Sequence, residues 1–338
     1  MGELVRSARL SAALYGGSHA AVQTQVEREA GGRVSRVASY WATGFTVVDE
    51  LDREPPTRTI ALRGAAWREE NVNSLALWRS LNDATPIRLH DTIATVAHRG
   101  MLNLAHELYS SELEPYIAFA PPNTTIRLCG HSAGGSLALL VALVALGAGA
   151  VLASYLRVDA FGSPSVLGCE PEGEGGDALG AHGLQSCNVN WVVLGKDPIA
   201  RFWIASDPFW RLVANSPLNS LINVRRPVLG RSSLFTSSRF LYEESGSVMV
   251  LEEAEDGSVS SHSLNTAASQ RLSVSDFSPA MARKAIAQHS AWRYAKALEC
   301  LLDAESRSES SDKDHIRGQL DLRGESGSNV VSPFIESA

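Results

Sequence analysis

The stretch Thr124-Thr-Ile-Arg-Leu-Cys-Gly-His-Ser-Ala-Gly-Gly-Ser136 decides how this chain folds. Residues 126–129 are mostly apolar and predict a short buried strand, and the apolar run 136–146 predicts a helix. Between them, glycines lie two residues before and two residues after Ser132. A strand, a tight turn that carries a serine and a helix, in this order, are typical of a nucleophile elbow.

The glycines of this turn have a physical reason. The turn holds Ser132 in a strained backbone conformation that lifts its hydroxyl clear of the chain, and a Cβ at Gly130 or Gly134 would collide with the neighbouring strand or helix. The first turn of the helix directs N–H groups and the positive end of its dipole toward the place where an oxyanion would form. The five-residue pattern also occurs by chance, but its strand and helix context favours a catalytic serine.

Length, composition and charge narrow the class of protein. The chain has 338 residues, of which 44% are hydrophobic and 20% charged, as expected for one large α/β domain or two small ones. The net charge of −7 is concentrated in 170–177 and after Asp303, which leaves the rest close to neutral and speaks against a nucleic-acid-binding face. The N-terminus lacks a long apolar signal segment, so we expect an intracellular protein that is soluble or peripheral.

One uncharged run invites a different interpretation. From Ser132 to Leu156 no residue is charged, which is long enough for a membrane span. The glycines in Gly147-Ala-Gly149 divide the run into a buried helix and a buried strand, so we expect no transmembrane segment.

The rest of the chain predicts an α/β fold around the elbow, with a mostly parallel central sheet and helices on both faces. We expect two helices within residues 3–30 and a long helix from 97 to near Pro115. The expected strands are 40–48, 59–62, 156–161 and 189–194, with a hairpin joining 239–243 to 248–251. A last helix should reach Leu302, and the Ser-rich, charged tail 303–338 is predicted to be disordered. Residues 1–302 would then form a single domain.

Three segments outside this framework allow more than one interpretation. In 67–81, helical spacing of apolar residues favours a surface helix packed on the core, and the alternative is a lid over an active site. An aromatic cluster near 202–210 suits either a core or an acyl groove. The lid and groove candidates are Trp67, Leu75, Trp78, Leu81, Phe202 and Trp203. The acidic, Gly-rich loop 168–187 contains Cys169 and Cys187, which would pair only in an oxidising compartment.

A serine nucleophile needs a base and an acid, which in α/β-hydrolases follow it in the order acid, then histidine. Asp197 is the preferred acid because it follows the strand 189–194 directly, and Asp207 is the second choice. His289 is the preferred base and His262 the reserve; reaching Ser132 would require a helix break near 288–290 with Ser290 as the cap. The less favoured candidates lie inside a strand or in the acidic loop and are Asp159, Asp177 and His182.

The oxyanion hole is expected to combine two backbone N–H groups. One belongs to Ala133, directly after the serine, and the other comes from the loop Arg63-Gly-Ala65 after an earlier strand. No metal ion or organic cofactor is needed for this chemistry.

These residues together resemble the class 3 lipases, the fungal-lipase-like α/β-hydrolases. The similar segments are Ile60-Ala-Leu-Arg-Gly64, His98-Arg-Gly100, Gly130 to Gly135, Phe161-Gly-Ser-Pro164, Lys196-Asp-Pro198, and His289 with Tyr294. The likeness covers about residues 40 to 300, and the combination is far more specific than any one segment. One departure is Ala65, where the family usually has Thr or Ser whose hydroxyl helps the oxyanion hole. The loop between Cys169 and Cys187 is also longer than expected for the family.

The resemblance implies an esterase or lipase whose triad is Ser132, Asp197 and His289, and it favours the lid interpretation of 67–81. The expected substrates are acylglycerols, phospholipids or galactolipids, with transient contact to a membrane surface. Two alternatives stay open. One is a lipase-fold binding or signalling protein that has lost catalysis, suggested by Ala65, and the other is an esterase of small esters.

Overall fold

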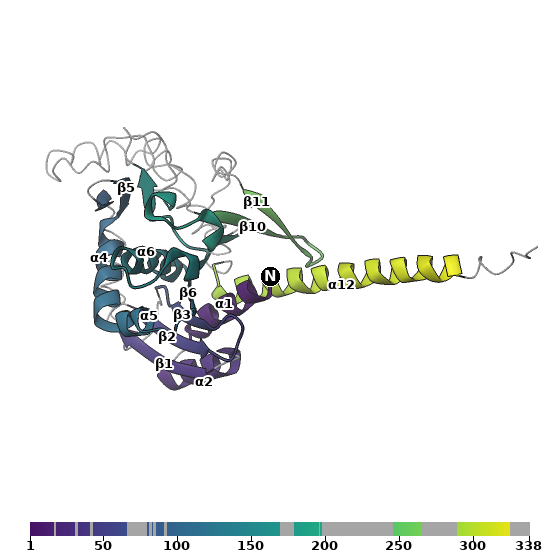
Figure 1. Cartoon of the computed structure of the whole chain (residues 1–338), viewed down its shortest axis with the longest axis horizontal. Helices are drawn as coiled ribbons and strands as arrows, with labels where there is room; N and C mark the ends of the chain where they lie inside the picture. Colours follow the sequence, from purple (N-terminus) through teal and green to yellow (C-terminus); the bar gives the residue numbers. More distant parts are fainter. Residues whose placement is uncertain are drawn as a thin grey trace, which may run out of the picture.

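The computed structural model describes residues 1–16, 18–30, 33–40, 43–65, 80, 83, 86–90, 93–169, 179–195, 197, 246–264 and 289–324. Within these residues a central sheet contains eight strands in the order β1-β2-β3-β6-β7-β9-β10-β11 (Figure 1). Their bounds are β1 Arg33–Tyr40, β2 Thr43–Glu50, β3 Thr57–Leu62, β6 Thr125–His131, β7 Leu156–Phe161, β9 Val189–Leu194, β10 Ser247–Glu253 and β11 Val259–Leu264. The strands from β3 to β10 run parallel, whereas β1, β2 and β11 pair antiparallel at the two edges. The mostly parallel sheet that the sequence predicts is confirmed.

Helices cover both faces of this sheet (Figure 1). One face carries α4 Arg99–Leu108, the π-helical turn η1 Tyr109–Leu113, α5 Glu114–Ala118 and α6 Ala133–Gly147. The other face carries α1 Gly2–Ala13, α2 His19–Ala30 and α12 Ala291–Gly324. Short 3-10 turns are η2 Ala153–Tyr155, η3 Gly180–His182 and η4 Ser186–Asn188. A small antiparallel sheet holds β4 Pro86–His90, β5 Ile93–His98 and β8 Leu167–Cys169.

The strands divide the core into two layers, because successive side chains of a strand point to opposite faces of the sheet. In β9, Trp191 and Val193 pack against the α6 side, while Val192 and Leu194 pack against the α1 and α12 side. All of these side chains are almost completely buried. Burial on both faces explains why residues 191–194 of β9 form a continuous apolar run rather than an alternating one.

The uncharged run after the elbow folds as the sequence predicts. α6 is buried from Ala133 to Ala145 around its whole circumference, as expected of a helix that is hydrophobic on every side and lies in a protein core. The run then turns and enters β7. In the described part of the chain, no helix is long and apolar enough to cross a membrane.

The two N-terminal helices form as expected, and a buried carboxylate holds the first of them on the sheet. Asp159 in β7 is fully buried and accepts hydrogen bonds from Ser7 of α1 at 2.6 Å, from Arg127 at 2.7 Å and from Asn190 at 2.7 Å. Removing one partner of such a network would leave a charge uncompensated in the low-dielectric interior, which would destabilise the fold. The network therefore fixes where α1 lies relative to β6, β7 and β9.

Both edges of the central sheet differ from the sequence prediction. β1 is an additional strand, and the expected strand 40–48 is split between the end of β1 and the start of β2. β10 has β9 on one edge and β11 on the other, so the expected hairpin with 239–243 is wrong, and 239–243 lie outside the described residues. β11 is mostly polar, as is common for edge strands, so a search for apolar runs does not predict it.

The C-terminal helix is longer than the sequence predicts. α12 runs to Gly324, so residues 303–324 are helical rather than disordered, and Figure 1 shows this part extending away from the body of the molecule. Beyond Leu302 the segment has no proline and no glycine before Gly318, and acids and bases are interspersed along it. Such composition lets a helix persist without an apolar face. Residues 325–338 lie outside the described part.

Candidate active site

The centre of the site is the turn between β6 and α6. Ser132 has φ 58° and ψ −136°, a region that non-glycine residues rarely adopt, and it directly precedes the first residue of α6. Its N–H donates a 2.8 Å hydrogen bond to the carbonyl oxygen of Phe161 at the end of β7. The strained serine conformation expected for a nucleophile elbow is therefore present.

The glycines around Ser132 allow close packing of backbone on backbone. A Cβ built on Gly130 would lie 2.3 Å from the carbonyl carbon of Gly134, and one built on Gly134 would lie 2.3 Å from the carbonyl oxygen of Leu62. Both distances are far below van der Waals contact. The N-terminus of α6 therefore lies directly against β6 and the end of β3. A side chain at either glycine would not fit between these backbones.

Asp197 and His289 meet at the same edge of the sheet. Asp197 follows β9, is fully buried and donates its N–H to the carbonyl oxygen of Leu194 at 2.8 Å. Its Oδ2 lies 2.7 Å from Nδ1 of His289, a residue 92 positions later in the chain. The side chain of His289 is 15% exposed, so one part of the imidazole faces away from the protein core. The structure thus brings the preferred acid and the preferred base into hydrogen-bond contact.

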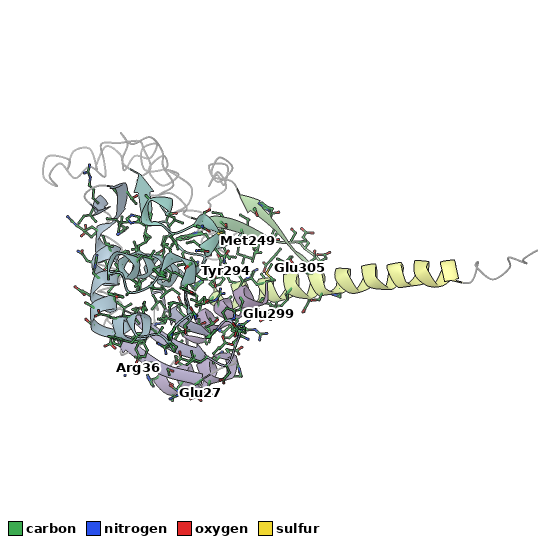
Figure 2. The ribbon with its side chains drawn as sticks, in the orientation of Figure 1. Glu27, Arg36, Met249, Tyr294, Glu299 and Glu305 are labelled. Atoms are coloured by element: carbon green, nitrogen blue, oxygen red, sulfur yellow. The ribbon has the colours of Figure 1, made fainter. Side chains whose placement is uncertain are left out.

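The carboxylate is held by a tyrosine as well. The hydroxyl of Tyr294 donates to Oδ2 of Asp197 at 2.5 Å and accepts the N–H of Leu194 at 3.1 Å. Tyr294 is completely buried and lies where α12 meets the body of the molecule (Figure 2). Gly162, at φ 58°, leaves the space for this pair, because a Cβ there would come within 2.7 Å of the Tyr294 hydroxyl and 2.8 Å of Asp197 Oδ2.

The start of α12 places His289. The helix begins at Ala291, and the carbonyl of Ser290 accepts the N–H groups of Arg293 at 2.9 Å and Tyr294 at 3.4 Å. Ser290 therefore occupies the capping position that the sequence predicts. Residues before His289 lie outside the described part, so the structure does not test the other side of the expected helix break.

His289 lies beside the elbow. Its ring centroid is 4.6 Å from that of His131, the residue directly before Ser132. His131 is buried, and burial, followed by the proximity of His289, holds its pKa well below the usual value. His131 is therefore neutral near pH 7.

The loop after β3 packs on the elbow. A Cβ on Gly64 would lie 2.6 Å from the carbonyl oxygen of His131 and 3.0 Å from Cβ of Ser132. Ala65, the next residue, is partly buried against the core. Ala133 is the first residue of α6, and the first N–H groups of a helix have no partner within it. The oxyanion roles of the Ala65 and Ala133 N–H groups stay predictions.

Other candidates from the sequence lie elsewhere. His262 is exposed on β11, His182 is in η3, and Asp159 belongs to the network that holds α1. Cys187 is a free thiol. Among the described residues there is no group of three or more His, Cys, Asp or Glu side chains that could hold a metal ion. The candidates outside the described residues are Asp177, Asp207, Trp67, Leu75, Trp78, Leu81, Phe202 and Trp203.

Tyr15 is a site residue that sequence reasoning missed. It follows α1, and its hydroxyl accepts the N–H of Gly64 at 3.0 Å and lies 3.1 Å from Nδ1 of His131. In the sequence it is an unremarkable aromatic residue near the end of the first helix, with no motif around it. Only the position of α1 on the sheet brings it to the elbow.

Comparison with known proteins gives relatives and structural neighbours. The family Lipase (class 3) matches residues 59–205. The chain is 29% identical over 232 residues to "Phospholipase A1 PLIP2, chloroplastic" of Arabidopsis thaliana, covering 67% of this chain and 30% of that protein. It is 28% identical over 204 residues to "Phospholipase A1 PLIP1, chloroplastic" of the same plant, covering 59% of this chain and 28% of that protein. The chain thus spans less than a third of the length of these curated relatives.

Two solved structures share the fold. A fungal lipase in complex with an inhibitor matches with a TM-score of 0.56 and 16% identity, covering 83% of this chain and 91% of that chain. A triacylglycerol lipase described as having a serine protease triad matches with a TM-score of 0.50 and 17% identity over the same shares, 83% and 91%. Both confirm the α/β-hydrolase fold predicted from the sequence. Over residues 59–205, less than half of its length, the chain is similar to the class 3 lipases.

Proposed function

We propose that this chain is a serine hydrolase of acyl-lipid esters, with Ser132 as nucleophile, His289 as general base and Asp197 as the acid that orients the base. One observation carries the proposal: the 2.7 Å hydrogen bond between the buried Asp197 and His289, beside a serine held at φ 58°. A strained serine, an imidazole and a buried carboxylate at one sheet edge are the groups that acyl transfer requires.

The bond between Asp197 and Nδ1 of His289 assigns the proton of the neutral ring to Nδ1 and leaves the lone pair on Nε2. In the proposed reaction, Oγ of Ser132 attacks the ester carbonyl carbon and its proton passes to Nε2. The imidazolium then protonates the leaving alcohol oxygen as the ester C–O bond breaks, giving an acyl-enzyme. Water attacks that acyl group, His289 takes the water proton and returns it to Ser132, and the fatty acid leaves.

The negative oxygen of each tetrahedral intermediate would be held by the N–H groups of Ala133 and Ala65. Their proposed places are the positive end of α6 and the loop that packs against Ser132. Ala65 has no hydroxyl to add as a third donor. Since one oxyanion donor is worth ~2.7–4 kcal/mol at the transition state, a slow enzyme is expected unless another donor takes that place.

Phospholipids are the first substrates to test, because the curated relatives are named phospholipases A1. Acylglycerols and galactolipids are the other candidates. The proposed lid at 67–81 and acyl groove near Phe202 and Trp203 would be used at a lipid surface. A sharp rise in rate above the solubility limit of the substrate is expected for such a lipase, whereas smooth saturation would identify an esterase of small esters.

The test compares wild type, Ser132→Ala and Ser154→Ala. Ser154 lies in η2 at the opposite end of β7 and serves as the matched control. A fluorophosphonate probe should label wild type and the control but not Ser132→Ala, and the same pattern should hold for hydrolysis of phosphatidylcholine vesicles, triacylglycerol emulsions and galactolipid micelles. A folded wild-type sample that is neither labelled nor active on any of these would refute the proposal.

The absence of a hydroxyl at residue 65 favours one further candidate, a lipase-fold binding protein without catalysis. Under that alternative the three proteins would bind lipid vesicles equally and none would hydrolyse them. Hydrolysis that depends on Ser132 excludes it.

A further inference from the structure

We infer that Tyr15 is a positioning residue for the oxyanion hole, whose hydroxyl ties the loop after β3 to the nucleophile elbow. The inference rests on the proposed function and adds to it an element from the N-terminal helical region. The contacts of the Tyr15 hydroxyl with Gly64 and His131 let it act through the residues directly before Ala65 and Ser132.

The Tyr15 hydroxyl lies at a junction of three polar groups. It accepts the N–H of Gly64 at 3.0 Å and lies 3.1 Å from Nδ1 and 3.3 Å from the carbonyl oxygen of His131. A hydroxyl has one proton to donate, so it donates to one of the two His131 atoms while it accepts from Gly64. In either case it bridges the residue before Ala65 and the residue before Ser132.

The junction leaves little free space. A Cβ on Gly64 would be 2.7 Å from the Tyr15 hydroxyl and 3.0 Å from Cβ of Ser132, so there is no room for a side chain between the loop and these groups. The Tyr15 ring meets the His131 ring edge-on, with centroids 5.5 Å apart and planes at 80°. Oxyanion donors act at 2.7–3.1 Å from the developing charge, so a shift of a few tenths of an ångström in this loop weakens them.

Tyr15 is anchored from the other side by α1. Ser7 of α1 donates to the fully buried Asp159 at 2.6 Å, and Arg9 contacts Glu299 of α12 at 2.5 Å (Figure 2 labels Glu299). Tyr15 lies two residues after this helix, and its backbone N–H donates to the carbonyl oxygen of Ala12 at 3.1 Å. The tie therefore connects the loop to a helix that is itself fixed on the sheet.

The protonation state of His131 keeps this tie intact. Protonation would turn Nδ1 from a possible acceptor into an obligatory donor and would place a charge in a buried position. The groups that face it are Tyr15, His289 and Tyr294. Because burial and His289 both disfavour the charged ring, the bridge is expected to be the same throughout the neutral pH range.

The test uses Tyr15→Phe in the full chain, with Tyr155→Phe as the matched control. Both variants keep the ring and remove a single hydroxyl, and the Tyr155 hydroxyl donates to an exposed group, Oδ1 of Asn123, at 3.0 Å. Tyr155 lies in η2, at the end of β7 away from the elbow. For each protein we would measure kcat and KM on a soluble nitrophenyl ester, and the inhibition constant of an alkyl boronic acid, which mimics the tetrahedral intermediate.

For Tyr15→Phe we expect kcat to fall by about 10-fold to 100-fold, less than the loss of a complete oxyanion donor, while KM stays within about twofold. The boronic acid should bind more weakly by a similar factor, because it needs the same two N–H groups. Tyr155→Phe should match wild type in each measurement. A merely structural hydroxyl would lower the melting temperature without changing kcat and the inhibition constant together. Unchanged kcat and inhibition constant, or a Tyr15→Phe chain that does not fold, would overturn the inference.

Amide hydrogen exchange supplies a readout that does not depend on activity. The Gly64 amide should exchange faster in Tyr15→Phe than in wild type and should be unchanged in Tyr155→Phe. Equal exchange in all three proteins would refute the tie, even in a sample without hydrolase activity. A wild type that is inactive and unlabelled would refute the proposed function, whereas an active wild type with an equally active and equally protected Tyr15→Phe would refute only the role of Tyr15.

Discussion

Replacing Gly134 by alanine should destabilise the chain and disable the elbow together. A Cβ at this position would lie 2.3 Å from the carbonyl oxygen of Leu62, 2.7 Å from the carbonyl carbon of Arg63 and 2.8 Å from the nitrogen of Gly64. All three atoms belong to the backbone, so no side-chain rotation relieves the contact. Either α6 or the loop after β3 has to move by about 1 Å to restore ordinary van der Waals distances.

The magnitude follows from the two opposing effects of the substitution. Overpacking a well-packed interior costs about 1–3 kcal/mol where side chains can adjust, so a clash with fixed backbone should reach the upper end, about 3 kcal/mol or more. The better helix propensity of alanine offsets about 1 kcal/mol at most. Gly147→Ala, in the last turn of the same helix, is the matched control, because nothing lies within 4 Å of its added Cβ. We expect it to be neutral or stabilising by up to about 1 kcal/mol.

Urea unfolding followed by circular dichroism, together with the rate of fluorophosphonate labelling, would measure both effects. Gly134→Ala should unfold at a clearly lower urea concentration than wild type and label much more slowly, while Gly147→Ala should do neither. If Gly134→Ala matches wild type in midpoint and in labelling rate, then α6 does not approach the end of β3 as closely as the structure indicates, and the account of the elbow glycines is wrong.

Three further predictions concern single side chains near the site. Tyr294→Phe should lower the free energy of unfolding by about 2–4 kcal/mol, measured in urea, because the buried N–H of Leu194 loses that acceptor and a buried carboxylate loses a donor. His131 has a folded-state pKa well below 6.5, so the unfolded chain binds a proton that the folded chain does not; as the pH falls below about 6.5, this residue should cost about 1.4 kcal/mol of stability per pH unit, and His131→Gln should remove that slope from urea midpoints measured between pH 5 and 7. Burial raises the pKa of Cys129 to about 12, so iodoacetamide should leave it unmodified in the folded chain while it alkylates the exposed Cys187, as peptide mass spectrometry would show.

The sequence predicts well those elements whose signal is local. The expected bounds of the strands 156–161 and 189–194 agree with β7 and β9, because each is a mainly apolar segment that ends before a glycine, Gly162 or Gly195. The elbow is equally local, since a glycine on each side of Ser132 is needed wherever a strand turns sharply into a helix. In both cases the pattern contains the whole physical cause of the structure.

Elements whose cause lies elsewhere in the chain were predicted poorly. β11 is polar and becomes a strand because β10 offers it a free edge, and the second half of α12 continues because the packed half of the same helix has already nucleated it. Neither the neighbouring edge nor the packed half is visible in a short window of sequence. Apolar content alone therefore underestimates how far such segments are ordered.

The same distinction applies within the site. Chain order predicts Asp197, after a strand, and His289, before the last helix. The structure shows the two hydrogen-bonded, and their catalytic roles stay predictions. Tyr15 could not be proposed, because a hydroxyl that supports a backbone loop needs no motif and can come from any element that reaches the loop. It reaches this one because Asp159, on β7, holds α1 through Ser7. Sequence patterns predict catalytic side chains more easily than the residues that position them, because only catalytic side chains require particular residue types in a particular order.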